Sequence, residues 1–212
     1  MPRLRLARVL LIAVVALGVT APHAAAAPTD RRLAGTLGAL WERVLEEPVA
    51  TNPFTGGSPC LRLDGPVAPF VPVGTAAVQC TVPHGTKVLV TALSYECSTF
   101  EDPPFAGRDE AELRACARRA TAGFGVPTVM VDGVAVVVRE VESRLIRFDA
   151  PEDNVFGRPA GPGLSVARGW VVLLPPLSPG RHAIRIQVVG TDVFGTSIDV
   201  DSTTTIRVRA RR

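Results

Sequence analysis

The chain has 212 residues, of which 47% are hydrophobic, and its 23 basic and 20 acidic residues give a formal net charge of +3. Three of the arginines lie within the first eight residues, so the remainder carries 20 residues of each sign and is near neutral. Because no basic stripe is left to neutralise phosphates, the composition argues against nucleic-acid binding.

Residues 1–27 are predicted to be a secretory signal peptide. Arg3, Arg5 and Arg8 form a basic start, an apolar run follows over 9–19, and small residues at 24–27 offer cleavage sites. An uncleaved membrane anchor is the alternative, but the apolar run is shorter than the roughly 20 residues that a spanning helix needs. We therefore expect a secreted, extracellular protein without a membrane span after cleavage.

The remaining chain, about 185 residues, suits one domain with a hydrophobic core. We expect an N-terminal helix and linker over 28–50 and a β-sandwich domain over 51–212. Apolar residues at helical spacing over 30–47, followed by Pro48, predict the helix. The simplest interpretation packs this helix on one end of the sandwich, with Trp41 as its anchor. A membrane-surface or partner-binding helix is the alternative.

Four cysteines in an exported chain predict two disulfides. Of the three possible pairings we favour the sequential one, Cys60–Cys80 with Cys97–Cys116. Closing loops of about 20 residues is worth roughly 3 kcal/mol each in the chain-entropy model. The alternative is a zinc site, but such sites use closely spaced pairs such as Cys-x-x-Cys, which this chain lacks. No metal site is predicted from the cysteines.

The middle of the chain reads as strands interrupted by one helix. Strands are expected at 78–82 and 86–93, around a Pro-His-Gly turn. Residues 95–105 are expected to leave the sheet with three acids and two phenylalanines. A second helix follows over 109–122, with Asp109 and Glu112 at capping-box spacing.

The last third returns to strand pattern. An Asp-Gly turn at 132–133 predicts a type I′ hairpin, a strand is expected at 143–148, and 149–163 is expected to be an irregular loop. Two apolar runs at 170–174 and 184–188 flank a proline-rich corner and are interpreted as the central hairpin. A final pair is expected at 197–200 and 204–208. The predicted fold class is mainly β: an antiparallel β-sandwich, Ig-like or jelly-roll-like, with eight to ten strands, two short helices and two disulfides.

Several motifs recur together in one known group of proteins. The segments are CTVPHGTK, ECS, LRACA, VDG, PEDNVFG and LSPGRH, in this order from about Trp41 onward. The chain resembles a family of uncharacterised secreted β-sandwich proteins from high-GC bacteria. Relatives tend to carry aromatic residues where this chain has Leu89 and Val90. The resemblance implies the fold and export, and it implies no known activity.

The predicted ligand surface combines loop acids with loop aromatics. Paired carboxylates about 5–10 Å apart could act on a glycoside, and loop acids can also bind Ca²⁺. The acid spacing matches no calcium loop, so no cofactor is predicted and Ca²⁺ is the alternative. Ordinary solvated roles are the competing interpretation. The candidate ligand-binding residues are Tyr95, Glu96, Phe100, Glu101, Asp102, Glu152 and Asp153.

No catalytic residue is predicted. The chain has no Gly-x-Ser-x-Gly nucleophile motif, and neither His84 nor His182 has a suggestive neighbour in sequence. His182 is expected to be a hydrogen-bonded structural residue. We predict an exported, non-enzymatic protein that binds a cell-envelope or extracellular component, with a cell-surface protein or glycan as partner. The alternatives are a secreted hydrolase acting on wall polysaccharide through the loop carboxylates, and a structural envelope protein without a ligand.

Overall fold

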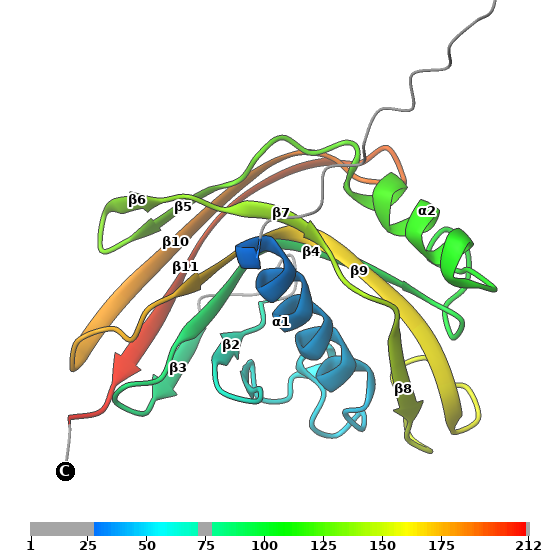
Figure 1. Cartoon of the computed structure of the whole chain (residues 1–212), viewed down its shortest axis with the longest axis horizontal. Coiled ribbons are helices and arrows are strands. Elements are labelled where there is room, and N and C mark those ends of the chain that lie inside the picture. Colours follow the sequence, from blue (N-terminus) through cyan, green and yellow to red (C-terminus); the bar gives the residue numbers. More distant parts are fainter. Residues whose placement is uncertain (1–27, 72–77, 211–212) are drawn as a thin grey trace, which may run out of the picture.

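The computed structural model describes residues 28–71 and 78–210 and shows two β-sheets with two α-helices (Figure 1). The predicted signal peptide lies outside these residues. Sheet 1 has six strands, in the order β1 (Cys60–Arg62), β2 (Val67–Pro69), β4 (Val88–Ser98), β9 (Gly161–Leu174) and β7 (Arg139–Glu142), with β8 (Ile146–Ala150) also paired to β9. Sheet 2 has five, in the order β3 (Gln79–Val82), β11 (Ser197–Val208), β10 (Gly180–Thr191), β5 (Thr128–Val131) and β6 (Val134–Val136).

The predicted mainly β, two-sheet arrangement is confirmed, with two differences of detail. The described residues form 11 strands, more than the eight to ten expected. Each sheet also contains one parallel pair, β2 with β4 and β3 with β11, so the sandwich is mixed rather than purely antiparallel. β3 and β4 are neighbours in sequence but lie in different sheets, which leaves β3 free to pair with the last strand of the chain.

The core lies between the sheets because strands in both sheets alternate their apolar residues. Val88 and Val90 of β4 point into this core, where they meet Ile184, Ile186 and Ile206 of sheet 2. The predicted wet face of β10 is also observed, since Arg185 is exposed and pairs with Asp201 on β11. Alternation therefore assigned the inward faces of β10 and β11 correctly.

The two helices lie on opposite faces of sheet 1: α1 (Pro28–Leu45) covers the outer face, and α2 (Glu110–Thr121) packs on the face that also faces sheet 2. α1 packs Leu37, Leu40 and Val44 against Leu89 and Val171, so it crosses the sheet face rather than one end of the sandwich (Figure 1). Its apolar stripe has the predicted spacing. β9 thus lies between α1 on one face and sheet 2 with α2 on the other, which explains why its sequence is apolar on both faces.

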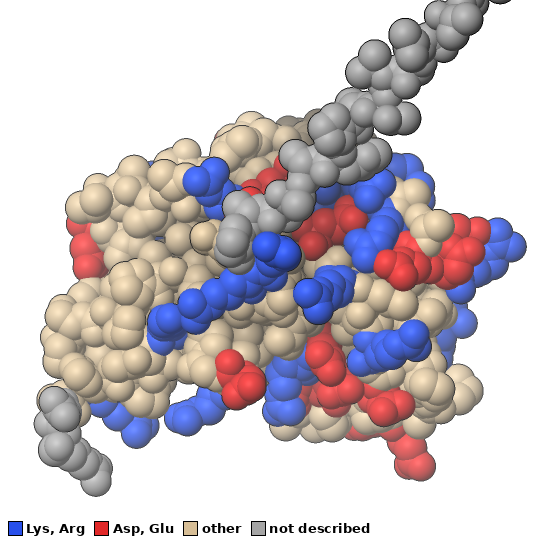
Figure 2. Space-filling model, viewed as in Figure 1, with Lys and Arg blue, Asp and Glu red and all other residues tan. Residues whose placement is uncertain are grey.

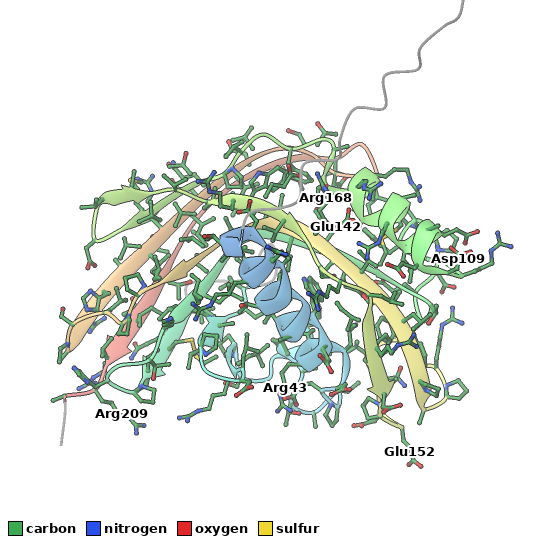
Figure 3. The ribbon with its side chains drawn as sticks, in the orientation of Figure 1. Arg43, Asp109, Glu142, Glu152, Arg168 and Arg209 are labelled. Carbon is green, nitrogen blue, oxygen red and sulfur yellow. A yellow bond between two sulfur atoms is a disulfide. The ribbon has the colours of Figure 1, made fainter. Side chains whose placement is uncertain are left out.

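α2 begins as its capping pattern predicts, because the Asp109 side chain accepts a hydrogen bond from the Glu112 amide at 2.9 Å. On its sheet-facing side, Arg114 and Arg118 contact Glu142 of β7 at 2.8 and 2.9 Å. Arg168 of β9 also reaches Glu142, and Figure 3 shows the two side chains together beside α2. This ionic cluster ties α2 to sheet 1.

The proline-rich corner does not join a hairpin. β9 belongs to sheet 1 and β10 to sheet 2, so residues 175–179 carry the chain from one sheet to the other. β9 pairs instead with β4, β7 and β8. Other boundaries also differ from expectation: β4 continues to Ser98, β9 starts at Gly161 inside the predicted loop, and the expected final pair at 197–200 and 204–208 is the single strand β11.

Both predicted disulfides are present. Cys60–Cys80 joins β1 of sheet 1 to β3 of sheet 2 with a Cα–Cα distance of 5.5 Å. Cys97–Cys116 joins β4 to α2 at 6.1 Å. Over the part of the chain that the structure describes, no helix has the length and apolar character needed to cross a membrane.

Charges are mixed on the outer surface. Figure 2 shows basic and acidic side chains interspersed over the face that carries α1 and α2. This pattern agrees with the near-neutral balance of the chain beyond the predicted signal peptide.

Candidate functional site

A cavity of about 630 Å³ opens beside the second half of β4. Its walls come from the end of α1, the 3₁₀ turn η1 (Pro53–Thr55), β2, β4, the loops at 101–105 and 155–156, and the turn between β10 and β11. The largest single contribution is six consecutive residues of β4, Thr91 to Glu96. A cavity of this size matches the 300–1,000 Å³ typical of small-molecule sites.

The cavity exists because β4 is paired on one edge only. β9 follows β4 from Val88 to Ser98, whereas β2 meets the other edge at the single pair Val67 and Val88. Beyond that pair, no strand among the described residues takes up the second edge. A register shift between Thr91 and Leu93 bends β4 at this point. The bulged, half-paired strand thus forms the long wall of the cavity.

Aromatic side chains make up much of the remaining lining. Trp41 meets Phe70 edge to face at 5.4 Å, and Phe54 meets Phe70 in the same way at 5.1 Å. Tyr95 and Phe105 stack at 5.9 Å on another part of the wall. Edge-to-face and stacked pairs hold rings in defined orientations. The walls are therefore apolar and built from mutually packed rings.

Trp41 also links α1 to the strand wall. Its indole Nε1 donates a hydrogen bond to Oγ of Ser94 on β4 at 3.1 Å. The ring itself is 5% exposed and lines the cavity. The anchor role predicted for Trp41 is observed, and the same residue contributes to the candidate site.

Two glutamates lie side by side in the wall. Glu96 is buried on β4, and its Oε2 accepts a hydrogen bond from Ser165 of β9 at 2.5 Å. Glu101, from the loop after β4, hydrogen-bonds to the Glu96 carboxyl and is half-buried. Its Oε2 has no hydrogen-bond partner among the described residues, and neither has Oγ1 of Thr91, which lines the same cavity.

This carboxyl pair holds a proton at neutral pH. Burial raises the pKa of Glu96, against the lowering effect of the Ser165 hydroxyl. Burial also raises the pKa of Glu101, and the neighbouring Glu96 charge raises it further. Two adjacent carboxyls in an apolar wall cannot both be ionised cheaply. Their titration belongs to the pair rather than to either residue.

The charged lining has one sign. Among the described residues that line the cavity, the ionisable acids are Glu96, Glu101 and Asp192, and there is no lysine, arginine or histidine. Burial, together with the nearby Asp192, raises the pKa of Tyr95. The cavity is therefore apolar with an acidic wall.

The structure brings three of the predicted ligand-binding residues to this cavity. Tyr95, Glu96 and Glu101 line it, although Tyr95 and Glu96 belong to β4 rather than to a loop. Phe100 lies behind the wall, packed against Phe148 and Phe156.

The other predicted acids point elsewhere. Asp102 is exposed and pairs with Arg158 at 2.6 Å. Glu152 and Asp153 are exposed just after β8, and Figure 3 shows Glu152 extending outward at the edge of the molecule. The acids of the two loops therefore do not converge in one cleft.

Several residues that line the cavity were not identified from the sequence. Phe54 and Phe70 reach the cavity from the segments after α1, and Thr91 and Asp192 come from β4 and the β10–β11 turn. None carried a local signal, because their meeting depends on the order of the strands. Phe105 and Phe156, which come from loops, also line the cavity.

His182 makes a second polar cluster, at the end of the sandwich. Its Nδ1 lies 2.6 Å from Oδ2 of Asp132, and its Nε2 lies 2.8 Å from the carbonyl oxygen and 3.4 Å from Oγ of Ser178. This resembles a Ser-His-Asp arrangement, but a general base needs a free ring nitrogen facing the hydroxyl. Here both nitrogens face acceptors, so His182 is hydrogen-bonded between two turns, as expected.

No group of three or more histidine, cysteine, aspartate or glutamate side chains over 28–71 and 78–210 is arranged to hold a metal ion. No protein-family model matches the chain, and no curated protein matches it. Among solved structures, the solution structure of amebosin is similar over 62% of this chain and 88% of its own, at 11% sequence identity and a TM-score of 0.23. A likeness this low carries no argument about function.

Proposed function

We propose that the protein is an exported, non-enzymatic binding protein whose cavity holds a small, mainly apolar component of the cell envelope or extracellular fluid. The observation that carries this proposal is the cavity of about 630 Å³, walled by packed aromatic rings and by the half-paired strand β4. Sites for small molecules combine such apolar walls with a few polar groups that fix orientation. Glu96, Glu101 and Thr91 supply those polar groups here.

Export is supported by the signal-like N-terminus and by the two disulfides, which form and persist in oxidising compartments. The test is the intact mass of the protein recovered from the culture medium. We expect a chain that starts at or next to Ala27, and a full-length mass retained in the cell pellet would contradict export.

The alternative hydrolase finds less support. Glycosidases place two carboxyl groups about 5–10 Å apart, on either side of the bond that breaks. Glu96 and Glu101 are hydrogen-bonded to each other, while Asp102, Glu152 and Asp153 lie outside the cavity. The remaining acid of the described lining, Asp192, accepts hydrogen bonds from the Phe194 and Thr196 amides within its own turn.

The binding proposal is tested with Nile red, a neutral fluorophore that brightens in apolar surroundings. We expect saturable enhancement by the wild-type protein. Val155 lies at the cavity wall, whereas Val137 is 73% exposed and does not line the cavity. Val155→Trp should therefore reduce the affinity at least about tenfold, and the matched control Val137→Trp should leave it unchanged. Equal enhancement by both variants, or none by the wild type, would overturn the proposal.

A further inference from the structure

The charge of the cavity wall restricts what can occupy it. The described lining residues include three acids and no basic side chain. Arg158, in the loop that also carries Val155 and Phe156, is engaged by Asp102 at 2.6 Å. An anionic ligand would face Glu96, Glu101 and Asp192 without a compensating charge, which the low dielectric of an apolar wall makes costly.

The unpaired polar atoms of the wall are acceptors. Oε2 of Glu101 is a pure acceptor when ionised, and Oγ1 of Thr91 can accept through its lone pairs. Both are buried without a partner among the described residues. A buried polar atom left unsatisfied costs free energy, which a ligand donor recovers when the side chain turns toward the cavity that its residue lines. A ligand with several N–H donors fits this wall better than one with acceptors alone.

Aromatic rings extend the same preference. Trp41 donates its indole N–H to Ser94, which shares a face of β4 with Glu96, and its ring meets Phe70 edge to face at 5.4 Å in the cavity wall. Cations are attracted to the faces of aromatic rings, most strongly where water is excluded. Carboxylates and ring faces in one wall are a combination that favours a cation with an apolar body.

We propose that the occupant is a primary amine with an apolar chain or ring, bound as its ammonium ion at Glu96 and Glu101. This inference rests on the proposed function and names the ligand class of the same site. The ammonium group donates to the glutamate oxygens and to Thr91, and the apolar part packs among Trp41, Phe54 and Phe70.

Binding is coupled to proton release. In the empty cavity the carboxyl pair shares one proton and carries one negative charge. The incoming ammonium replaces that proton, which leaves for solvent, so the occupied site again has a net charge of minus one. Affinity therefore increases with pH from 5 to about 9, below the range in which alkylamines, like lysine near 10.4, lose their own proton.

Few other groups face the pair. Ser165 of β9 donates to Glu96, and the backbone of Ser98 hydrogen-bonds Glu101. Glu46 and Glu47 at the end of α1 are engaged elsewhere, by the Asp149 amide and by Thr51 with Arg43. Tyr95 and Asp192 complete the ionisable groups of the described wall. The pH dependence is thus assigned to the pair.

The test compares three ligands with the same eight-carbon chain, n-octylamine, 1-octanol and sodium octanoate, by isothermal titration calorimetry below their micelle concentrations. We expect the amine to bind at least about tenfold more tightly than the alcohol, and octanoate to bind more weakly than either. Titrations in buffers of different ionisation enthalpy should report release of close to one proton with the amine and none with the alcohol.

Variants separate the head group from the chain. Glu101→Gln should weaken the amine at least about tenfold and leave 1-octanol unchanged, which also shows that the variant is folded. Glu96→Gln serves as the second variant. Asp102→Asn, which removes a charge from the same loop outside the cavity, should change neither ligand.

The outcomes distinguish this inference from the proposed function. Equal affinity for amine and alcohol, or tightest binding of octanoate, would overturn the amine assignment while the cavity remains a binding site. Absence of binding by all three ligands together with Nile red would overturn both. Equal weakening of the amine by Asp102→Asn would move the cation site out of the cavity.

Discussion

The hydroxyl of Ser165 on β9 donates a hydrogen bond to Oε2 of Glu96 on β4 across 2.5 Å, and both side chains are buried. The two residues are diagonal across the strand pair, since Ser165 is in register with Ser98 and Glu96 with Ala167. This bond lowers the pKa of Glu96 against the dominant effect of burial. It fixes the carboxyl at the wall of the cavity.

Ser165→Ala should therefore destabilise the protein by about 1–3 kcal/mol at pH 7, because a buried acceptor loses its donor. The measurement is the free energy of unfolding from denaturant titration. Ser197→Ala is the control, since Ser197 is exposed on β11 and its loss should stay within about 0.5 kcal/mol. Similar losses in the two variants would show that the Glu96 contact adds no stability.

The raised pKa of Glu101 predicts that stability falls as the solution becomes alkaline. The folded state holds the proton above the pH at which the unfolded chain, with an ordinary glutamate pKa near 4.5, releases it. Stability from this group is thus fully present below about pH 4.5 and is lost as the pH rises through the folded pKa.

Glu101→Gln removes that dependence, because the amide resembles the protonated acid. We expect the thermal midpoint of the variant to gain on the wild type steadily from pH 5 to pH 9. Asp102→Asn should run parallel to the wild type over the same range, because Asp102 is exposed. A constant difference between Glu101→Gln and the wild type at all pH values would contradict a shared buried proton.

The contact between His182 and Asp132 should also lose its stabilising effect as the pH rises, starting from a higher pH. The hydrogen bond that His182 donates to the Asp132 carboxylate raises the pKa of His182, so its stabilisation is present below the ordinary value of 6.5 and is lost as pH rises through the folded pKa. Asp132→Asn should lower that pKa, as measured by proton NMR of the imidazole. Asp132 has φ 51°, a conformation that asparagine tolerates, so the turn is kept. An unchanged His182 pKa would contradict the assignment.

Local patterns were sufficient for elements whose faces are set by alternation or capping. The Asp109 cap, the Asp132-Gly133 turn and the inward residues of β10 and β11 were all readable, because each depends on residues a few positions apart. The sequence did not predict which strands pair with β9. Its run from Trp170 looks the same whether β10 or β4 lies beside it, and an apolar strand covered on both faces carries no mark of its partner.

The residues of the candidate site also divide into those that local sequence patterns identify and those that they do not. Glu96 and Glu101 stood out because acids near a disulfide are visible in the sequence, and the structure brings them together. Asp102 is adjacent to Glu101 yet points outward to Arg158, and the loop backbone decides which of the two neighbours turns inward. Phe54, Phe70 and Asp192 join the wall through contacts between distant segments, so no local pattern could mark them.

The two disulfides provide a matched pair of variants for the loop that carries Glu101. Each bridge closes a similar length of chain, with sequence separations of 20 and 19 residues. Loop closure of this size is worth roughly 3 kcal/mol, so Cys60→Ala/Cys80→Ala and Cys97→Ala/Cys116→Ala should lose similar free energies of unfolding. Only the second bridge flanks residues 98–109, where Glu101 and Phe105 enter the cavity wall. Nile red affinity, measured where each variant is still folded, should therefore fall further without Cys97–Cys116. Equal affinities in the two variants would show that the loop is held by its other contacts, such as the Ser98 and Phe105 backbone hydrogen bond at 3.2 Å.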